Sequence, residues 1–397
     1  MGYKIGKSKI FIKIKFKKII KDKELGFIQK IIWIRKFINK NRLSAFLFTS
    51  PSNIFYLSRF RSSNAFIIIT PKNQYFLTDA RYFEKAKKEL KNWEVILIKN
   101  GVFSFLKRFI KELKIKVLGF EKDDLTCEFK ERLRVKGVKF KGFSEVLKDL
   151  RIIKEKEEIK ILKEGVKRTD KIYKDVIEIL GNFIFSNKKQ DLTELKLRGF
   201  LVSKIFEIGG MGESFPTIIA SGKNSAIPHW QSSDSKIKKN APLLIDMGII
   251  WKGYCTDFTR TLYIGKPSSE FKRIYEIVKT AWYKGFEKVR RGIPVNEIDK
   301  TIREYFKTKE LDKFFIHSTG HGIGIDIHEP PKIYYQNIRS KKRKTQIEII
   351  EDGMVFTIEP GLYFPNKFGI RIENIVFVEN GRGKVYSEVD IELKIIE

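Results

Sequence analysis

The sequence predicts two domains of different architecture, a mixed α/β domain over residues 31–150 and an α+β domain over residues 151–397. The length of 397 residues leaves room for two hydrophobic cores. In the first domain, short apolar strands alternate with helical segments, which favours a partly parallel sheet. In the second, the order helices, strands, helices, strands favours two similar halves, with helices on one face of a mainly antiparallel sheet.

The chain carries a net charge of +32, and the excess is uneven. Residues 1–150 hold 36 Lys and Arg against 14 Asp and Glu, whereas residues 151–397 hold 44 against 34. Lysine is scattered through every segment, so we expect non-specific affinity for polyanions and no specific nucleic-acid partner. The best local candidate for such contact, Arg339-Ser-Lys-Lys-Arg-Lys344, is expected to be a solvated loop.

Residues 1–30 are expected to be a basic extension without a function of its own. They alternate with period two and lack the apolar core of a signal peptide. The two cysteines, Cys127 and Cys255, argue against a disulfide framework and suit a reducing cytoplasm. Cys255 is expected to be a small buried hydrophobe. No apolar run approaches the ~18–20 residues of a membrane span, so no membrane partner is expected.

The first domain contains apolar runs bounded by turn residues. Helices are expected at 31–39, 81–90 and 104–113, and strands at 45–48, 66–70, 75–78, 95–98 and 116–120. Pro71-Lys-Asn-Gln74 predicts a hairpin between the second and third strands, and Ser50-Pro-Ser-Asn53 predicts a turn. This domain has no histidine and no catalytic constellation.

The second domain begins after Arg151-Ile-Ile-Lys154 with a long amphipathic helix over 155–180. Asp191-Leu-Thr-Glu194 resembles a capping box and predicts a second helix, which ends at Gly209-Gly210. Strand patterns follow from 214 to 264, then a helical pair over 269–291 and 296–308, then strands from 314 to the C-terminus.

Two aspartates lie in a predicted β-hairpin at the centre of this domain. The strands are residues 243–250, apolar except for Asp246, and residues 254–264, which follow the turn Trp251-Lys-Gly253 and contain Asp257. A loop centred between Trp251 and Lys252 places the two carboxylates opposite each other with Cβ atoms ~5 Å apart, and a loop shifted by one residue makes them diagonal neighbours. Buried carboxylates this close require a cation, whereas solvated ones at a sheet edge would not.

All four histidines, His229, His317, His321 and His328, lie in the second domain. Imidazole is a common metal ligand and a proton carrier near neutral pH, so this concentration indicates a functional site. The glycines around His321 make a helix unlikely there and allow a ligand or backbone to approach closely. His328-Glu-Pro-Pro331 is expected to form a rigid turn.

Two glutamates add to the aspartates and histidines as candidate metal ligands. Glu359 follows a predicted strand at 355–358, and Glu373 lies within another at 370–378, on the same face as Arg371. Four carboxylates and one imidazole form an oxygen-rich ligand set that suits Mn²⁺, Co²⁺ or Fe²⁺ better than structural zinc. Such a set can hold two divalent ions ~3.5–4 Å apart with a bridging water or hydroxide as nucleophile.

At these positions the chain resembles the metallopeptidase family with the pita-bread fold, which includes Xaa-Pro aminopeptidases, Xaa-Pro dipeptidases and methionine aminopeptidases. The matching motifs of the second domain are Ser221-Gly222 through Pro228-His229, Asp246-Met-Gly, Asp257-Phe-Thr-Arg-Thr261, Gly320-His-Gly-Ile-Gly324, His328-Glu-Pro330, Glu359-Pro-Gly361 and Arg371-Ile-Glu373. Weaker matches to the family's creatinase-like N-terminal domain are Ser50-Pro-Ser-Asn-Ile-Phe-Tyr-Leu57 and Leu77-Thr-Asp-Ala-Arg-Tyr82.

The resemblance implies a role for each site residue. The implied metal ligands are Asp246, Asp257, His321, Glu359 and Glu373. Asp257 and Glu373 would bridge two ions, Asp246 would bind one, and His321 with Glu359 the other. His229 and His328 would contact substrate and carry protons or stabilise the tetrahedral intermediate, and Glu359 would help to deprotonate the nucleophilic water. His317 and Arg371 would shape the substrate pocket.

The implied activity is a dinuclear, manganese-favouring exopeptidase, with cobalt, iron or zinc as other metals, that cleaves the bond between an N-terminal residue and proline. The first domain and the presence of His317 favour the proline-directed branch over methionine aminopeptidases. An Xaa-Pro dipeptidase is the alternative, and a non-catalytic basic binding protein on the same fold is a second one. Relatives imply a homodimer.

Overall fold

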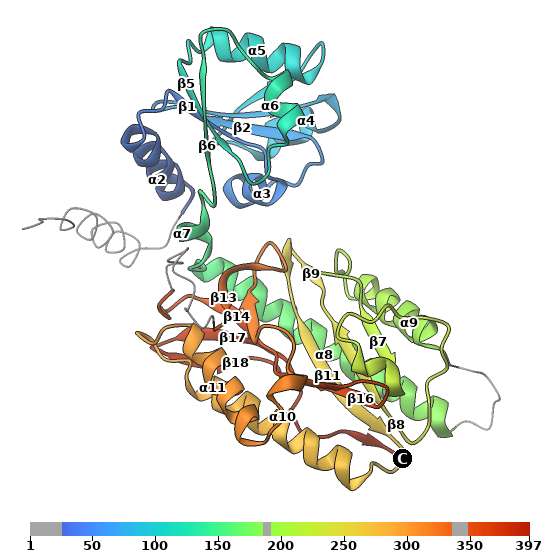
Figure 1. Ribbon diagram of the computed structural model, residues 1–397. Helices are drawn as coiled ribbons and strands as arrows, with labels where there is room; N and C mark the ends of the chain where they lie inside the picture. The colour runs from blue at the N-terminus through green and yellow to red at the C-terminus, as the bar shows by residue number, and fades with distance from the viewer. Residues whose placement is uncertain (1–25, 186–191, 336–347) are drawn as a thin grey trace, which may run out of the picture. The chain divides into compact units, whose positions relative to one another are not determined.

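The structure is a computed structural model that describes residues 26–185, 192–335 and 348–397. It divides into two compact units, residues 1–150 and 151–397 (Figure 1). Most of the predicted basic extension and the run Arg339–Lys344 lie outside the described residues. In the part of the chain that the structure describes, no helix combines the length and the apolar composition needed to cross a membrane.

The first unit contains a six-stranded mixed sheet with strand order β4-β3-β2-β1-β5-β6. Its strands are β1 (Ala45–Phe48), β2 (Ala65–Ile69), β3 (Gln74–Thr78), β4 (Glu94–Leu97), β5 (Val117–Glu121) and β6 (Lys139–Phe143). Its helices are α2 (Phe27–Lys40), α3 (Pro51–Ser58), α4 (Ala80–Glu89), α5 (Val102–Glu112), α6 (Cys127–Arg132) and α7 (Lys148–Arg151), the last of which ends at the first residue of the second unit. The β2–β3 hairpin is antiparallel and β1 pairs with β5 in parallel, which confirms the predicted partly parallel sheet.

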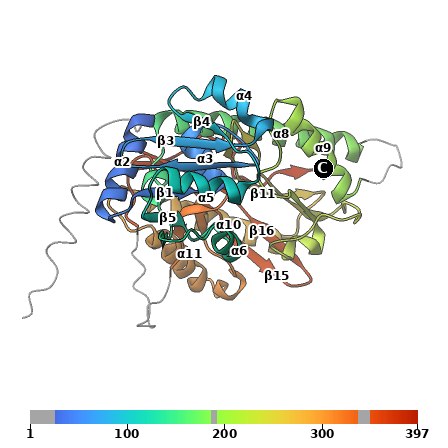
Figure 2. The same ribbon diagram turned by 90° about the horizontal axis from the view of Figure 1, so that it is seen from above.

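Helices cover both faces of this sheet (Figure 2). On one face, Phe105 and Phe109 of α5 join the apolar cluster formed by the strands. On the other face, Phe37 of α2 packs edge-on against Phe46 of β1. The period-two alternation of apolar side chains within β1 therefore supplies both layers.

Two predictions for the first unit need correction. Helix α2 begins at Phe27, within the range 1–30 predicted to be an extension. The predicted turn at Ser50–Asn53 is instead the start of helix α3, with Ser50 as N-cap and Pro51 at the first helical position. Proline has no backbone N–H to lose at that position, so a Ser-Pro pair fits the start of a helix as well as a turn.

The second unit repeats a pair of helices followed by strands. Its helices are α8 (Lys156–Phe185), α9 (Glu194–Glu207), α10 (Ser269–Glu287) and α11 (Asn296–Thr308), with short 3₁₀ turns η1 (Gly222–Ala226) and η2 (Asp312–Phe314). The strands of its first half are β7 (Ile218–Ser221), β8 (Ala241–Met247), β9 (Ile250–Trp251), β10 (Tyr254–Cys255) and β11 (Phe258–Ile264). Those of its second half are β12 (Gly320–Gly322), β13 (Glu329–Ile333), β14 (Val355–Ile358), β15 (Gly361–Phe364), β16 (Phe368–Arg371), β17 (Asn374–Glu379), β18 (Arg382–Val385) and β19 (Ile395–Ile396).

Each half packs its helices against its own sheet. Helices α8 and α9 share a core with β7, β8 and β11, which form the sheet β19-β11-β8-β7. Helices α10 and α11 share a second hydrophobic core with β14, β15 and β17. Of these strands, β14 and β17 belong to the sheet β13-β12-β14-β17-β18. The pairings are antiparallel except that of β11 with β19, which confirms the predicted mainly antiparallel α+β arrangement. The helix–strand repeat seen in the sequence is therefore a structural repeat.

Two predicted segments of the second half are built differently. The expected single strand over 370–378 is broken into β16 and β17, and Ile372 and Glu373 lie between them. The break moves Glu373 out of the ladder of β17 and into a bridge with Thr259 of β11. The expected turn at His328–Pro331 is largely strand β13.

The central hairpin forms, with its loop shifted by one residue and its pairing therefore displaced by two residues from an exact Asp–Asp opposition. Tyr254 pairs with Trp251, and Asp246 pairs with Thr259, so the loop is Lys252-Gly253. The two loop residues have φ of 47° and 91°, which is the left-handed pair required by a two-residue type I′ turn. Asp257 is therefore the diagonal neighbour of Asp246 on the same sheet face, as the shifted loop predicts.

Candidate metal centre

Five side chains predicted as metal ligands meet where the two halves of the second unit join. Asp246 lies near the end of β8, Asp257 just before β11, His321 in β12, Glu359 just after β14 and Glu373 between β16 and β17. One ligand atom from each of Asp257, His321 and Glu373 lies within 4.8 Å of the other two. His321 Nε2 also lies 3.4 Å from Asp257 Oδ2 and 3.6 Å from Glu359 Oε1.

Hydrogen bonds between the two halves and within the second half fix these positions. The Glu373 N–H donates to the Thr259 carbonyl at 3.0 Å, and the Thr259 hydroxyl donates to Glu373 Oε2 at 2.7 Å. The Glu359 N–H donates to the Thr319 carbonyl at 2.7 Å. Strand β12 is squeezed between β13 and β14, because a Cβ at Gly322 would lie 2.1 Å from the Pro330 carbonyl oxygen. The glycines beside His321 therefore admit neighbouring backbone.

The carboxylates of this cluster are buried close to one another. Burial, followed by the charges of Asp246 and Glu359, raises the pKa of Asp257 well above its ordinary value. Burial and then the charge of Asp257 do the same to the pKa of Glu373. Burial and then the charge of Glu373 raise the pKa of Glu359 to about 8. These raised pKa values mean that the clustered carboxylates are stabilised by bound positive charge, supplied either by protons or by metal cations.

Three carboxylate oxygens of the cluster have no hydrogen-bond partner among the described residues. They are Asp246 Oδ1, Asp257 Oδ1 and Glu373 Oε1, and all three are buried. A buried carboxylate oxygen without a donor costs free energy unless a cation approaches it. Carboxylates with one imidazole are the donor set that Mn²⁺, Co²⁺ and Fe²⁺ accept. The residues present therefore fit divalent metal ions.

Arg371 lies inside the cluster rather than at its edge. It is 3% exposed, and one terminal nitrogen, Nη2, donates to Asp246 Oδ2. The other, Nη1, donates to the Tyr363 hydroxyl at 2.7 Å, and its Nε donates to Thr259 Oγ1 at 3.2 Å. The predicted substrate contact is thus also a partner of a predicted metal ligand.

The other three histidines surround the cluster. His317 Nε2 lies 2.8 Å from the Tyr363 hydroxyl, and its Nδ1 lies 2.7 Å from the Ser318 carbonyl. Burial, followed by the charge of Arg371, lowers the pKa of His317 to about 3, so its ring is neutral and Nδ1–H is the donor to Ser318. Arg371, Tyr363 and His317 then form one directed chain of hydrogen bonds.

His328 and His229 lie near the same point. The rings of His328 and His321 are 4.2 Å apart, and burial followed by the charge of His321 lowers the pKa of His328. The exposed His229 follows Pro228, whose carbonyl accepts from Arg371 Nη1 at 3.4 Å, and the charge of His229 contributes to the lowered pKa of His317 and His328. All the predicted site residues are thus gathered in one region.

Two residues with no role predicted from the sequence also contact the centre. Tyr363 links Arg371 to His317, and Thr259 links Glu373 to Arg371. The position of Thr259 can be inferred from the sequence. It lies two residues after Asp257, so its side chain is expected on the same sheet face as Asp257 and Asp246. The sequence around Tyr363 does not indicate such a position, because Tyr363 comes close to Arg371 only through the pairing of β15 with β16.

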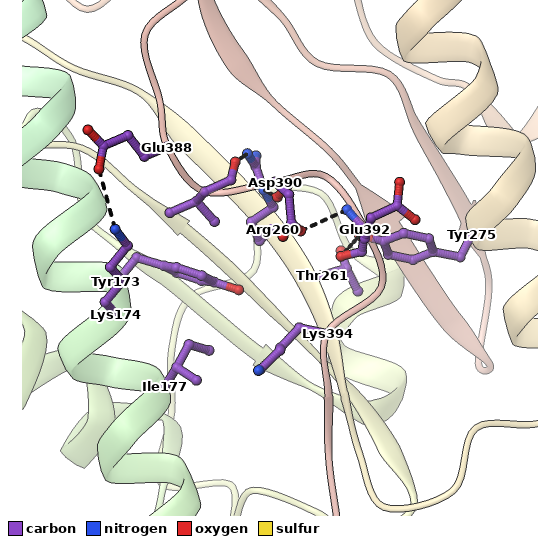
Figure 3. A pocket seen from close by; sticks show the side chains of 11 residues that line it. Tyr173, Lys174, Ile177, Arg260, Thr261, Tyr275, Glu388, Asp390, Glu392 and Lys394 are labelled. Atoms are coloured by element: carbon purple, nitrogen blue, oxygen red, sulfur yellow. Dashed lines mark hydrogen bonds and ion pairs between the residues drawn. The ribbon is translucent and has the colours of Figure 1, made fainter.

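A cavity of about 280 Å³ lies elsewhere, and none of the predicted site residues lines it (Figure 3). Its walls include Tyr173 of α8, Tyr275 of α10 and Arg260 of β11. Arg260 donates to the carbonyls of Thr259, Glu373, Val389 and Asp390 and to the side chain of Asn374. With its five N–H groups used, Arg260 braces the backbone beneath the metal centre.

Comparison with known proteins identifies both units. Residues 160–380 match "Metallopeptidase family M24", and residues 31–153 match the "Creatinase/Prolidase N-terminal domain". A protein named Xaa-Pro dipeptidase from Pyrococcus furiosus is 32% identical over 366 residues, which cover 90% of this chain and 97% of that protein. A putative Xaa-Pro aminopeptidase from Mycoplasma genitalium is 33% identical over 88% of this chain and 94% of that protein.

Solved structures agree. An Xaa-Pro dipeptidase from Bacillus anthracis superposes with a TM-score of 0.85 at 31% identity, covering 93% of this chain and all of that one. The expected fold class, a creatinase-like domain followed by a pita-bread domain, is thereby confirmed. The chain belongs to metallopeptidase family M24, whose members use divalent metal ions.

Proposed function

We propose that this metallopeptidase removes the N-terminal residue from peptides that have proline in the second position. The observation that carries the proposal is the group of buried carboxylate oxygens near His321 for which the described part of the chain supplies no hydrogen-bond donor. The relatives named Xaa-Pro aminopeptidase and Xaa-Pro dipeptidase support the choice of substrate. A proline amide lacks an N–H, so a peptidase with a dedicated pocket is needed to cleave it.

We assign two divalent ions, with Mn²⁺ favoured, to Asp246, Asp257, His321, Glu359 and Glu373. When bound, such ions polarise the scissile carbonyl and lower the pKa of water. Asp257, Glu373 and His321, which each offer a ligand atom within 4.8 Å of the other two, would hold the ions together with Asp246 and Glu359. Arg371 holds Asp246 in place through its ion pair.

The remaining polar residues handle protons and position the substrate. Glu359 is partly buried beside His321 and would take a proton from the attacking water at a carboxylate oxygen. His328 and His229 present imidazole groups near the reacting carbonyl, and a neutral ring can donate one N–H to the developing oxyanion. His317 is held with Nδ1–H toward Ser318 and Nε2 toward Tyr363, so it shapes the pocket without carrying charge.

A dipeptidase is the second candidate, because solved and curated relatives of comparable similarity are named Xaa-Pro dipeptidase. Initial rates on an Xaa-Pro dipeptide and on the matched Xaa-Pro-Yaa tripeptide, each with Mn²⁺, separate the two activities. A faster rate on the tripeptide supports the aminopeptidase, and activity confined to the dipeptide supports the dipeptidase.

No hydrolysis of either peptide with Mn²⁺ or Co²⁺ would contradict both. A salt-sensitive shift of nucleic acid in its place would support a basic binding protein. We further propose that the protein works in a reducing cytoplasm, which suits its two free cysteines. We also propose that it forms a homodimer. Light scattering coupled to size-exclusion chromatography measures the oligomeric state.

A further inference from the structure

Glu194, the first residue of α9, has a fully buried side chain on which five hydrogen bonds converge. Oε1 accepts from the Ser221 N–H at 2.8 Å and from Asn224 Nδ2 at 2.9 Å. Oε2 accepts from Trp230 Nε1 at 2.8 Å, and from the Ser233 N–H and hydroxyl at 3.1 and 3.0 Å. Both oxygens act as acceptors from donors that lie 27 to 39 residues further along the chain.

All five donors belong to residues 221–233, the segment that carries His229. Most of this segment lies between β7 and β8 with only the short 3₁₀ turn η1, so regular pairing does not hold its second part. Glu194 therefore supplies the order that a sheet ladder would otherwise give.

The start of α9 reinforces the same attachment. The backbone N–H groups of Glu194 and Leu195 donate to the carbonyls of Ser235 and Ser233, both at 3.0 Å. These N–H groups are in the first turn of the helix, where no intrahelical acceptor exists. The N-terminal backbone of α9 and the side chain of Glu194 thus both bind the stretch of chain that follows His229.

His229 lies between two fixed points of that segment. On its C-terminal side, the adjacent Trp230 is held by Glu194. On its N-terminal side, the carbonyl of the adjacent Pro228 accepts from Arg371 Nη1 at 3.4 Å. The backbone around His229 is therefore tied to the metal centre on one side and to α9 on the other.

We propose that Glu194 is a positioning residue that holds His229 at the substrate. This inference rests on the proposed peptidase function, in which His229 contacts the reacting group. None of the five proposed metal ligands lies in residues 221–233, so Glu194 acts on substrate alignment and leaves metal binding alone.

The test is Glu194→Gln, which keeps the shape of the side chain and replaces one acceptor oxygen with a donor. We expect kcat on an Xaa-Pro-Yaa peptide to fall about tenfold, because small misplacement of a catalytic group is costly. Affinity for Mn²⁺, measured by isothermal titration calorimetry, should stay within about twofold, since the donors lie outside the ligand set. Glu213→Gln is the matched control: Glu213 accepts from Arg198 and from the Thr217 N–H, before β7, and its substitution should leave kcat unchanged.

A double-variant cycle separates positioning from general structural support. In a His229→Ala background, Glu194→Gln should change kcat by less than about twofold, because both changes act through one side chain. A full tenfold loss on top of His229→Ala would overturn the proposal. If Glu194→Gln does not fold, Trp230→Phe, which removes one of the five donors, should give a smaller loss of kcat that is likewise absent in the His229→Ala background.

A readout without catalysis distinguishes failure of this inference from failure of the proposed function. The chain has four histidines, so their ring signals can be resolved by NMR and that of His229 assigned with His229→Ala. Glu194→Gln should shift the His229 signal and leave that of His321 in place. An inactive wild-type protein with this shift would contradict the peptidase and support the positioning role. An unshifted His229 signal would contradict the positioning role.

Discussion

Asp257 immediately precedes strand β11 and Arg260 lies three residues later within it; both are buried, and the odd spacing directs their side chains to opposite faces of the sheet. Arg260 uses its five N–H groups on acceptors that include the carbonyl of Glu373 and the side chain of Asn374. Asp257 keeps one buried oxygen with no hydrogen-bond partner among the described residues and lies beside other carboxylates. A buried charge with every partner present supports the fold, whereas a buried charge that lacks a partner marks a place where a ligand can bind.

The strongest test of this distinction is Asp257→Asn, which removes the charge and keeps the shape. We expect peptidase activity with Mn²⁺ to fall by more than about 100-fold, because loss of a metal ligand exceeds the effect of losing its outer partners. In the presence of a chelator, the same variant should have a higher Tm than wild type, since repulsion from Asp246 and Glu359 is relieved. Retained activity, or a lower Tm under chelation, would show that Asp257 is a structural residue.

On the other face, Arg260→Lys should destabilise the protein whether or not metal is present. Lysine has three donors on one nitrogen and cannot serve acceptors spread around a planar guanidinium. Leaving several buried carbonyls without a donor should lower the free energy of unfolding by about 3 kcal/mol. Urea denaturation measures the loss with and without Mn²⁺, and Arg198→Lys, at a half-buried pair with Glu213, should cost less than about 1 kcal/mol. A loss that vanishes without Mn²⁺ would place Arg260 with the metal site.

The pH dependence of stability should also differ between the faces. Burial raises the pKa of Glu359 to about 8, and the pKa of Asp257 and of Glu373 is raised as well. Since the folded state holds these protons more tightly than the unfolded state, their contribution to stability is complete below about pH 4 and is lost as pH rises through about 8.

The Tm of the chelated protein should therefore fall by about 5 °C or more between pH 5 and pH 8. Added Mn²⁺ should reduce this fall, because a cation replaces the protons. Differential scanning fluorimetry across this range gives the result. A Tm that is flat with pH under chelation would contradict the mutual repulsion of the carboxylates, and Asp257→Asn should flatten it.

The strands of the hairpin can be predicted from local pattern, and the family motifs single out the candidate metal ligands Asp257, His321 and Glu373 that the structure brings close together. What it could not supply was the set of partners. Tyr363 and Glu194 are recognised only once strands and segments distant in the chain are placed together, since their hydrogen bonds span 8 to 46 residues. The break between β16 and β17 cannot be predicted from the sequence, because residues 370–378 alternate like one strand. The break depends on the bridge between Glu373 and Thr259, which is distant in the chain.

The hairpin loop gives the smallest expected effect and tests the register on which the two faces depend. Lys252 has φ of 47° in a type I′ turn, a conformation that asparagine adopts more readily. Lys252→Asn should gain about 0.5 kcal/mol from this and lose a similar amount from the exposed ion pair of Lys252 Nζ with Glu164 Oε2. Urea denaturation should thus show a change within about 1 kcal/mol, and activity should be unaltered. Gly253→Ala, at φ of 91°, should instead destabilise by about 1 kcal/mol or more, because a Cβ is strained there. The opposite ranking would mean that the loop is centred one residue earlier, with Asp246 directly facing Asp257.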